Sequence, residues 1–178
     1  HGFCERGPVV VIQPSKVFYQ RVQVKDVPDI IQTTIMENKI IDRLLYKDPA
    51  TGEKIIYENE IPFYKKQLRL IFGNNGKIDP TKIEDYIAIG GYSSLAKATT
   101  EMSSESVVEE IKNSGLRGRG GGGFPTGRKW ESCRKAEDEI KYVICNADEG
   151  DPGTFQDRSI LEGNPHVVIE GMLIGAYA

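Results

Sequence analysis

The chain of 178 residues contains little cysteine, only Cys4, Cys133 and Cys145. These three cannot all pair with one another, and none forms a close Cys-x-x-Cys couple, so a disulfide framework is not indicated. The simplest context for such a chain is a reducing compartment, and we expect the cytoplasm. We interpret Cys133 and Cys145 as structural thiols, because Cys145 lies in an apolar run and Cys133 has no partner at the spacing of metal ligands.

The sequence also lacks an excess of positive charge and a long apolar run. Its formal net charge is −3 and its isoelectric point is near 5.5, which excludes a general nucleic-acid-binding surface. No apolar stretch approaches the ~20 residues of a membrane span, and the longest is interrupted by Glu170 and by glycines. With 39% hydrophobic and 28% charged residues, the composition predicts a water-soluble globular protein.

Both ends of the sequence predict an internal piece of a longer polypeptide. It begins HGFCERGP, without an initiator methionine or a signal peptide. It ends GMLIGAYA, within the apolar pattern of a helix. We therefore expect a longer parent protein.

The first sixty residues predict a small β-β-α unit followed by a linker. β-Branched and alternating residues predict a hairpin of two strands, 9–13 and 17–22, joined by a three-residue turn. Asp26 is expected to cap a helix that runs through residue 39. Residues 40–60 are interpreted as a linker that contains a short strand.

The rest of the chain is predicted to be mainly helical. Helices are predicted wherever a cap or a proline precedes an apolar pattern, with starts at Pro62, at Asp79–Pro80, at Ser103 or Ser104, and at Asn164–Pro165. Residues 141–145 (KYVIC) predict a short buried strand that leads directly into the polar segment NADEGDPGTFQDR. A strand that ends in a polar loop is a common ligand site in open α/β sheets.

The stretch 115–130, GLRGRGGGGFPTGRKW, contains seven glycines in sixteen residues. Glycines lose much backbone entropy on folding and add almost nothing to a core, so we expect something outside the chain to stabilise this stretch. The spacing G-x-G-x-x-G is present, but a helix precedes it, where a dinucleotide-binding fingerprint requires a strand. The chain also lacks the G-K-[ST] end of a P-loop, since Trp130 follows Lys129.

The remaining interpretation is an anion-binding loop beside a flat ligand. Successive bare N–H groups form a concavity for anions, and Arg117, Arg119 and Lys129 can add charge-assisted contacts to phosphate. Phe124 is expected to stack on a flat ring such as a nicotinamide or an adenine. A flexible linker is the alternative, but linkers favour serine and lack Phe-Pro, arginine and tryptophan.

A second candidate site is the acidic segment NADEGDPGTF. It carries four polar side chains in six residues, namely Asn146, Asp148, Glu149 and Asp151. Such a cluster could hold a divalent cation, accept hydrogen bonds from ribose hydroxyls, or form a solvated turn, and the spacing leaves these alternatives open. It does not follow the order of a calcium-binding EF-hand loop.

Two long motifs carry a family resemblance. SGLRGRGGGGFPTGRKW, followed by ICNADEGDPGTFQDRSILEGNPHVVIEGM, closely resembles the flavoprotein subunit that oxidises NADH in respiratory complex I and its relatives. The match extends upstream through DYIAIGGYSSLAKA and so covers 85–178. Residues 1–40 resemble the second half of a thioredoxin-like [2Fe-2S] ferredoxin domain, whose C-x-G-x-C-x-x-G-P motif would end here at Cys4-Glu5-Arg6-Gly7-Pro8.

A ferredoxin-like segment fused upstream of the flavin module is most similar to the NAD(P)-linked flavoprotein subunit of multimeric, often electron-bifurcating, iron hydrogenases. The resemblance implies an α/β (α+β) fold in three parts: the C-terminal half of a thioredoxin-like [2Fe-2S] ferredoxin-like domain (1–40), a linker and helical segment (41–84), and the N-terminal part of an FMN- and NADH-binding domain (85–178). It implies FMN, NAD(H) or NADP(H), and iron–sulfur clusters, including [4Fe-4S], as cofactors of the full-length protein. Its partners would be other iron–sulfur and hydrogenase subunits.

The implied reaction is hydride transfer from NAD(P)H to FMN, after which electrons pass to iron–sulfur clusters. The residues implied around FMN are Gly118, Arg119, Gly120, Lys129, Asn146, Asp148 and Glu149. Those implied to face NADH are Gly121, Gly122, Phe124, Lys129 and Asp151. Cys4 would be a cluster ligand, and no residue is implied as an acid, base or nucleophile, because the cofactor carries the chemistry.

The sequence departs from the complex I subunits at two of these positions. Gly122 stands where they usually carry alanine, and Asp151 stands where they carry glutamate. The shorter carboxylate of Asp151 would tolerate a 2′-phosphate better, so the choice between NADH and NADPH stays open. The family's second glycine-rich loop and its [4Fe-4S] cysteines lie outside the 178 residues, so the isolated chain is expected to retain little FMN.

Two rival functions follow from the same residues. One keeps the redox chemistry but places the protein in a complex I-like NADH:quinone oxidoreductase or an NAD-linked formate dehydrogenase. The other is a non-redox module that binds phosphate or docks to another subunit.

Overall fold

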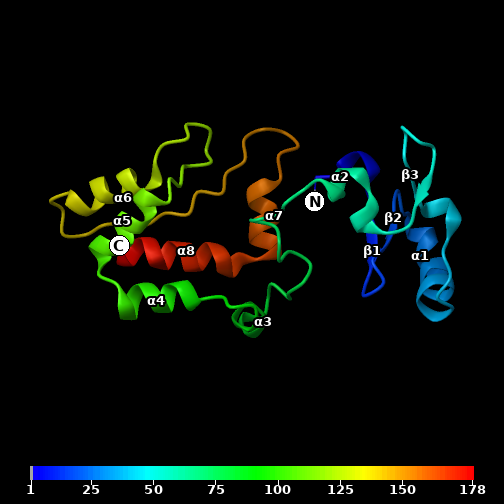
Figure 1. The fold of residues 1–178 in the computed structure, drawn as a ribbon, viewed down its shortest axis with the longest axis horizontal. Coiled ribbons are helices and arrows are strands. Elements are labelled where there is room, and N and C mark those ends of the chain that lie inside the picture. Colours follow the sequence, from blue (N-terminus) through cyan, green and yellow to red (C-terminus); the bar gives the residue numbers. More distant parts are fainter. Residues whose placement is uncertain (1) are drawn as a thin grey trace. The chain divides into compact units, whose positions relative to one another are not determined.

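The computed structural model describes residues 2–178, and the chain divides into two compact units, 1–69 and 70–178 (Figure 1). The chain combines short helical segments with two small antiparallel sheets, and the predicted mixed α/β class is confirmed. The predicted three-part division, with boundaries near residues 40 and 84, stays a prediction. Among the described residues, every helix is too short or too polar to traverse a lipid bilayer.

Unit 1 is built on two small antiparallel hairpins. The first pairs β1 (Val10–Ile12) with β2 (Val17–Tyr19), in a register that places Val11 opposite Phe18. This confirms the hairpin predicted from the alternating residues. The second pairs β3 (Tyr46–Lys47) with β4 (Lys54–Ile55), which confirms a short strand within the segment predicted to be a linker.

Short helical segments surround these hairpins. Their bounds are Cys4–Arg6, Val24–Asp26, α1 (Val27–Asp29), the π-helical Ile30–Met36, Asp42–Leu44, Glu58–Glu60 and α2 (Pro62–Lys65). The helix predicted after Asp26 is therefore present and begins at Val27, but it is preceded by a 3-10 turn and ends at Met36 rather than at residue 39. The Asp26 carboxylate accepts a hydrogen bond from the Gln23 amide at 2.8 Å and forms an ion pair with Arg43 at 2.7 Å.

The core of unit 1 lies on both faces of the first hairpin because neighbouring side chains of a strand point in opposite directions. Tyr19 packs on one face and donates or accepts a hydrogen bond with the Thr34 hydroxyl at 2.7 Å. Phe18 packs on the other face against Ile61 and Tyr64. The linker prediction thus missed that the residues after 40 complete this core.

Unit 2 is a group of helices. Their bounds are α3 (Ile83–Ala88), α4 (Ser93–Glu101), α5 (Ser104–Asn113), α6 (Thr126–Lys135), α7 (Gln156–Gly163) and α8 (Pro165–Tyr177). In Figure 1, α8 (red) runs along α4 (green), and these two helices are in contact, as are α5 and α6. The helices predicted to begin at Ser103 or Ser104 and at Asn164–Pro165 are confirmed. The helix predicted to begin at Asp79–Pro80 is present but begins at Ile83, and α4, α6 and α7 were not predicted.

Two predicted elements are wrong. From Pro62 the apolar residues Phe63, Leu68 and Ile71 predict one longer helix, but the helix that begins there ends at Lys65. Residues 141–145 form no strand, and Cys145, predicted to be buried in one, is exposed. A strand needs a hydrogen-bonded neighbour, and within residues 70–178, all of which the structure describes, no segment pairs with this one.

A buried carboxylate joins three helices of unit 2. Glu170 on α8 is 8% exposed, and it accepts hydrogen bonds from the Tyr86 hydroxyl at 2.6 Å and from the amides of Tyr92 and Leu95 at 3.0 and 3.1 Å. The two amides belong to the first turn of α4, where helices have free N–H groups. Glu170 therefore caps α4 from a position 75 residues or more along the chain.

Candidate functional site

The glycine stretch forms a closed hairpin rather than an open coil. The Gly118 amide donates to the Phe124 carbonyl at 2.8 Å, and the Thr126 amide donates to the Leu116 carbonyl at 2.9 Å. On the tip side of the first bond, the guanidinium of Arg117 donates to the Gly123 carbonyl at 3.0 Å. The tip of the hairpin is therefore the four residues 119–122, which we call the glycine tip.

The glycine tip presents bare backbone to open space. A Cβ added at Gly120, Gly121 or Gly122 would meet no atom of the chain within 4 Å. Within the hairpin, which the structure describes completely, no backbone hydrogen bond uses the amides of the tip. Packing does not explain these glycines, so the exposed main chain is free for an external group.

Phe124 and Lys129 flank the glycine tip. Phe124 is 54% exposed, and the Arg128 guanidinium lies 5.9 Å from the centre of its ring, within the range of a cation–π contact. Its exposed face can stack on a planar ligand, as the sequence predicts. Lys129, on the first turn of α6, is exposed.

Close packing of α5 on α6 fixes the place where the hairpin begins and ends. Gly127 is buried, and a Cβ there would lie 2.6 Å from the Lys112 backbone nitrogen and 2.7 Å from its Cα. The two helices can approach this closely only because residue 127 has no side chain. A second tie joins Arg134 to Ser104 at 2.6 Å and to Glu105 through an ion pair. The hairpin therefore connects two closely packed helices, α5 and α6.

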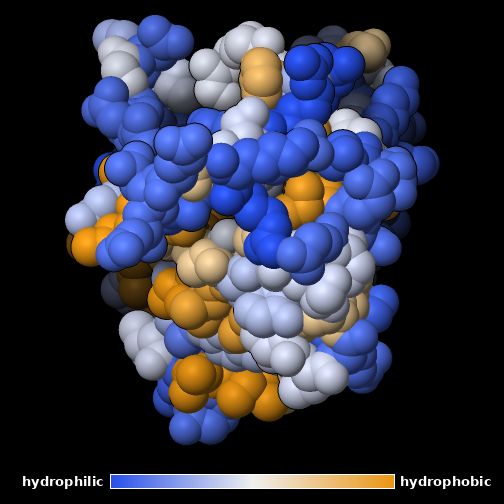
Figure 2. Space-filling model, turned by 90° about the vertical axis from the view of Figure 1, so that its left-hand side faces the viewer, coloured by the Kyte–Doolittle hydropathy of each residue, from blue (hydrophilic) through white to orange (hydrophobic). Residues whose placement is uncertain are grey.

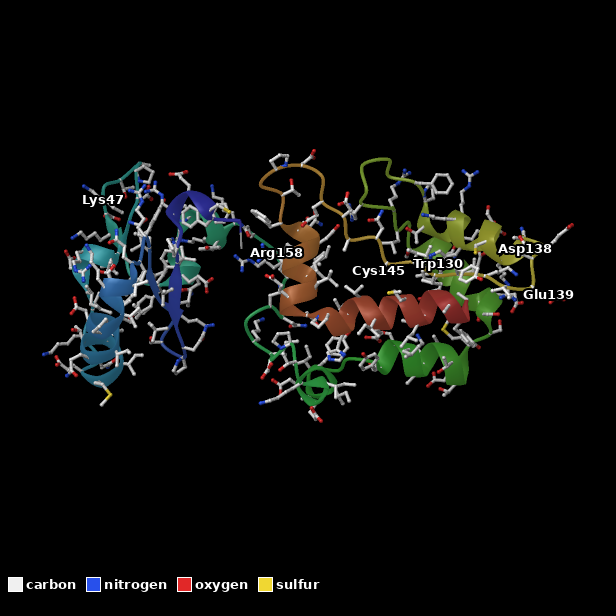
Figure 3. All side chains as sticks on the ribbon, turned by 180° about the vertical axis from the view of Figure 1, so that it is seen from behind. Lys47, Trp130, Asp138, Glu139, Cys145 and Arg158 are labelled. Carbon is white, nitrogen blue, oxygen red and sulfur yellow. The ribbon has the colours of Figure 1, made fainter. Side chains whose placement is uncertain are left out.

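The acidic segment is an extended loop that ends at α7. The Asn146 side chain accepts a hydrogen bond from the Asp148 amide at 3.0 Å, which makes a local turn. Asp148 and Asp151 are exposed. Figures 1 and 3 show this loop and the glycine hairpin projecting from the same edge of unit 2. No hydrogen bond or ion pair joins the two segments, each described in full.

Glu149 has a structural task that the sequence did not reveal. Its carboxylate accepts hydrogen bonds from the amides of Asp157 at 2.7 Å and Arg158 at 3.2 Å, so it caps the first turn of α7. Burial on its own would raise the pKa of Glu149, but the hydrogen bonds from these backbone amides outweigh it and hold the pKa below its usual value. A carboxylate has about four acceptor positions, so Glu149 can still accept from a ligand.

No metal site is visible in the part of the chain that the structure describes. Cys4 is exposed in a short helical turn, and residues 2–178 contain no cluster of three or more histidine, cysteine, aspartate or glutamate side chains able to hold an ion. The cation-binding alternative for the acidic segment thus has no support from geometry. The assignment of Cys4 to a cluster stays a prediction.

A separate hollow of about 960 Å³ lies beside α8. It is lined by Trp130 of α6, by Val143 and Ile144 of the extended segment, and by Ile169 and Met172 of α8. Figure 3 shows Trp130 and Cys145 along this part of the unit, and Figure 2 shows hydrophobic residues exposed at the same end of the molecule. Lys129 is the only predicted cofactor residue on its lining. The lining is mainly apolar but also includes Lys129, Arg134 and Lys141, and no residue of the glycine tip belongs to it.

Comparisons with known proteins find a family match for the part of the chain that contains this site. Residues 111–178 match the Nuo51 FMN-binding domain. This match contains the glycine hairpin, the acidic loop, α7 and α8, and it confirms the resemblance predicted from the two motifs. The Nuo51-like region is therefore residues 111–178.

Three relatives illustrate the likeness. The chain is 57% identical over 114 residues to the NADP-reducing hydrogenase subunit HndC of Solidesulfovibrio fructosivorans, which covers 64% of this chain and 23% of the relative. It is 54% identical over 96 residues to an NADH-quinone oxidoreductase subunit of Rhizobium meliloti, with coverage of 54% and 23%. It is 64% identical over 74 residues to the alpha subunit of the NAD-reducing hydrogenase HoxS of Cupriavidus necator, with coverage of 42% and 12%.

The chain spans less than a quarter of the length of each of these three relatives. Among solved structures, a crystal structure of an NAD⁺-reducing [NiFe]-hydrogenase in the air-oxidised state is 25% identical and covers 97% of this chain and 26% of its own. Its TM-score is 0.48, too low to support an argument about the arrangement of the units.

Proposed function

We propose that the full-length protein is a flavoprotein subunit that oxidises NAD(P)H through FMN and passes electrons to iron–sulfur clusters within a multimeric hydrogenase of the cytoplasm. The observation that carries this proposal is the glycine tip, whose bare backbone faces open space inside the Nuo51-like region. FMN, when bound, supplies the redox chemistry, and the residues of this chain bind and orient.

The residues of the hairpin fit a flat, anionic ligand. The open amides of the glycine tip can donate to phosphate or carbonyl oxygens, and Arg119 and Lys129 add positive charge beside them. In our assignment, Gly118, Arg119, Gly120 and Lys129 contact FMN, while Gly121, Gly122, Phe124, Lys129 and Asp151 contact the nicotinamide nucleotide. Asn146, Asp148 and Glu149 complete the flavin site from the acidic loop.

The proposal extends to the iron–sulfur clusters and to the electron acceptor of the full-length protein. The iron–sulfur clusters belong to the full-length protein and its partner subunits, with Cys4 as one ligand. The electron acceptor has a second candidate, a complex I-like assembly, because the chain is also 54% identical over 96 residues to a protein named as an NADH-quinone oxidoreductase subunit.

Reduction of the flavin tests the proposal. The full-length protein, reconstituted with FMN under anaerobic conditions, should lose its oxidised-flavin absorbance when NADH or NADPH is added. A protein that binds FMN but shows no such reduction, or binds no FMN at all, would leave the non-redox docking module as the better account. Titration with both nucleotides also decides between NADH and NADPH, a preference that the residue at position 151 leaves open.

Removal of the Phe124 ring should weaken nucleotide binding more than flavin binding. For Phe124→Ala in the full-length protein we expect a roughly 3- to 10-fold rise in the Kd for NADH, the cost of one lost stacking contact, with FMN content retained. Stopped-flow reduction of the flavin over a range of NADH concentrations measures it.

Tyr142 provides the control. It is an aromatic residue that is 75% exposed, and it lies outside both candidate segments. Tyr142→Ala should leave the Kd for NADH unchanged. Equal effects of the two substitutions would mean that stacking on Phe124 is not the cause.

A further inference from the structure

The Arg117 side chain spans the base of the glycine tip. Its guanidinium donates to the Gly123 carbonyl at 3.0 Å, on a backbone that already pairs residue 118 with 124 and residue 116 with 126. Gly121 and Gly123 have positive φ values of +99° and +58°. Glycine adopts positive and negative φ about equally readily, so these residues do not by themselves hold the backbone in this conformation. Arg117 makes the one side-chain hydrogen bond to the hairpin backbone between residues 118 and 124, all of which the structure describes.

We infer that Arg117 is a positioning residue: it orders the glycine tip before a cofactor arrives and does not itself bind the phosphate. This inference rests on the proposed function, and it assigns a task to a residue that the family resemblance left without one. It also replaces the interpretation, drawn from charge alone, that Arg117 contacts phosphate. The guanidinium is directed at a carbonyl of its own loop.

Arg117 can strengthen binding by preorganising the glycine tip. A loop that is competent for binding only part of the time binds with an apparent Kd raised by the inverse of that fraction. The charge-assisted bond from the Arg117 guanidinium to the Gly123 carbonyl favours the competent form, since no other side chain bonds to the backbone of residues 118–124, all of which the structure describes. Loss of this bond should therefore weaken every ligand of the tip, whatever its charge.

The first readout concerns the loop alone and needs no cofactor. In the 178-residue chain, Arg117→Met should speed the hydrogen exchange of the Gly118 and Thr126 amides, which close the hairpin, as measured by NMR. Lys97→Met, which removes one positive charge from the exposed surface of α4, is the control and should leave this exchange unchanged. Unchanged exchange in Arg117→Met would overturn the inference.

The second readout separates positioning from direct contact with phosphate. In the full-length protein with FMN, the second-order rate constant for flavin reduction is measured with NADH and with reduced nicotinamide riboside, which has no phosphate. We expect Arg117→Met to lower both constants by the same factor, about 10-fold, the ratio that one charge-assisted hydrogen bond provides. The limiting rate at saturating NADH should stay close to that of the wild type.

The two outcomes are distinct. A loss confined to NADH would make Arg117 a phosphate ligand and overturn the inference, as would a fall in the limiting rate with unchanged binding. Arg117→Lys keeps the charge and one donor and should recover part of the exchange protection. If the wild-type protein binds no flavin, the proposed function fails, while the exchange experiment still decides whether Arg117 orders the hairpin.

Discussion

Replacement of Glu170 with alanine is expected to lower the free energy of unfolding of unit 2 by about 3 kcal/mol, because a charged acceptor is lost from a buried network. The Tyr86 hydroxyl and the Tyr92 and Leu95 amides would then have no acceptor, and α4 would lose its cap. A native domain is stable by only about 5–15 kcal/mol, so the loss is a large share. Urea unfolding, followed by circular dichroism, measures it.

Glu170→Gln is the matched variant. It keeps the length and one acceptor oxygen but loses the charge, so we expect roughly half of the loss seen with alanine. Glu162, exposed on α7, provides a control in which Glu162→Ala should change stability by less than about 0.5 kcal/mol. An alanine effect at residue 170 no larger than at residue 162 would refute the capping role.

The same carboxylate should make the stability depend on pH. Burial on its own would raise the pKa of Glu170, but the hydrogen bonds from Tyr86 and from the α4 amides outweigh it and lower the pKa below the ordinary value of 4.5. A carboxylate whose pKa is lower in the folded than in the unfolded state stabilises the fold at pH values above its unfolded-state pKa. This stabilisation is lost as the pH falls through its folded-state pKa. Burial, followed by the bond to Glu170, raises the pKa of Tyr86, so this hydroxyl stays protonated and donating.

The comparison with Glu170→Gln isolates this dependence from that of other groups. His166 faces the same cluster, since its Nδ1 lies 2.8 Å from the Tyr92 hydroxyl and its ring stacks on Tyr86. Other carboxylates of the chain, such as Glu131 and Glu149, also have lowered pKa values and act in the same direction. The difference between wild type and Glu170→Gln should therefore shrink from about pH 7 to about pH 3. A constant difference would contradict the assignment.

Gly127→Val is expected to be the second severe substitution. The new Cβ would lie 2.6 Å from the Lys112 nitrogen and 2.7 Å from its Cα, so α5 and α6 must move apart. Because the obstacle is backbone rather than a flexible side chain, we expect a loss of about 3 kcal/mol or more, as for other severe overpacking. The glycine hairpin connects α5 to α6, so under the proposed function the binding of FMN by the full-length protein should fall as well.

Gly171→Ala is the control for Gly127. Gly171 also lies within a helix, α8, but a Cβ there would meet no atom within 4 Å. This substitution should stabilise the chain by about 0.5–1 kcal/mol, because alanine has the better helix propensity. Thermal unfolding of both variants should show opposite signs, and a neutral Gly127→Val would mean that the two helices are not packed as described.

Much of the fold was predictable where local signals agree with packing. The first hairpin has alternating apolar and polar residues, α5 begins after a capping serine, and α8 begins with a proline. The α6 sequence TGRKWESCRK is very polar, and its helix is held by the Gly127 contact and the Arg134 pairs, which connect residues far apart in the chain. Such long-range contacts leave no periodic signal in a single sequence.

The strand predicted over residues 141–145 was wrong for a related reason. Val143 and Ile144 favour β-structure, but the segment has no neighbouring strand among the described residues and stays extended and exposed. At the site, composition predicted the position of the glycine tip and the exposed ring of Phe124. The bond from Arg117 to Gly123 and the capping of α7 by Glu149 depend on the folded backbone and could not be predicted.

In the proposed function, Gly118 and the glycines from 120 to 123 lack side chains so that planar, charged cofactors can lie against their main chain. A crystal structure of the full-length protein with FMN and NADH bound tests it most directly. We predict both ring systems in van der Waals contact with this hairpin, the nicotinamide nucleotide against Phe124, and hydrogen bonds from the amides of the tip to at least one of the two ligands. Both cofactors bound elsewhere, with the tip still facing solvent, would contradict the account.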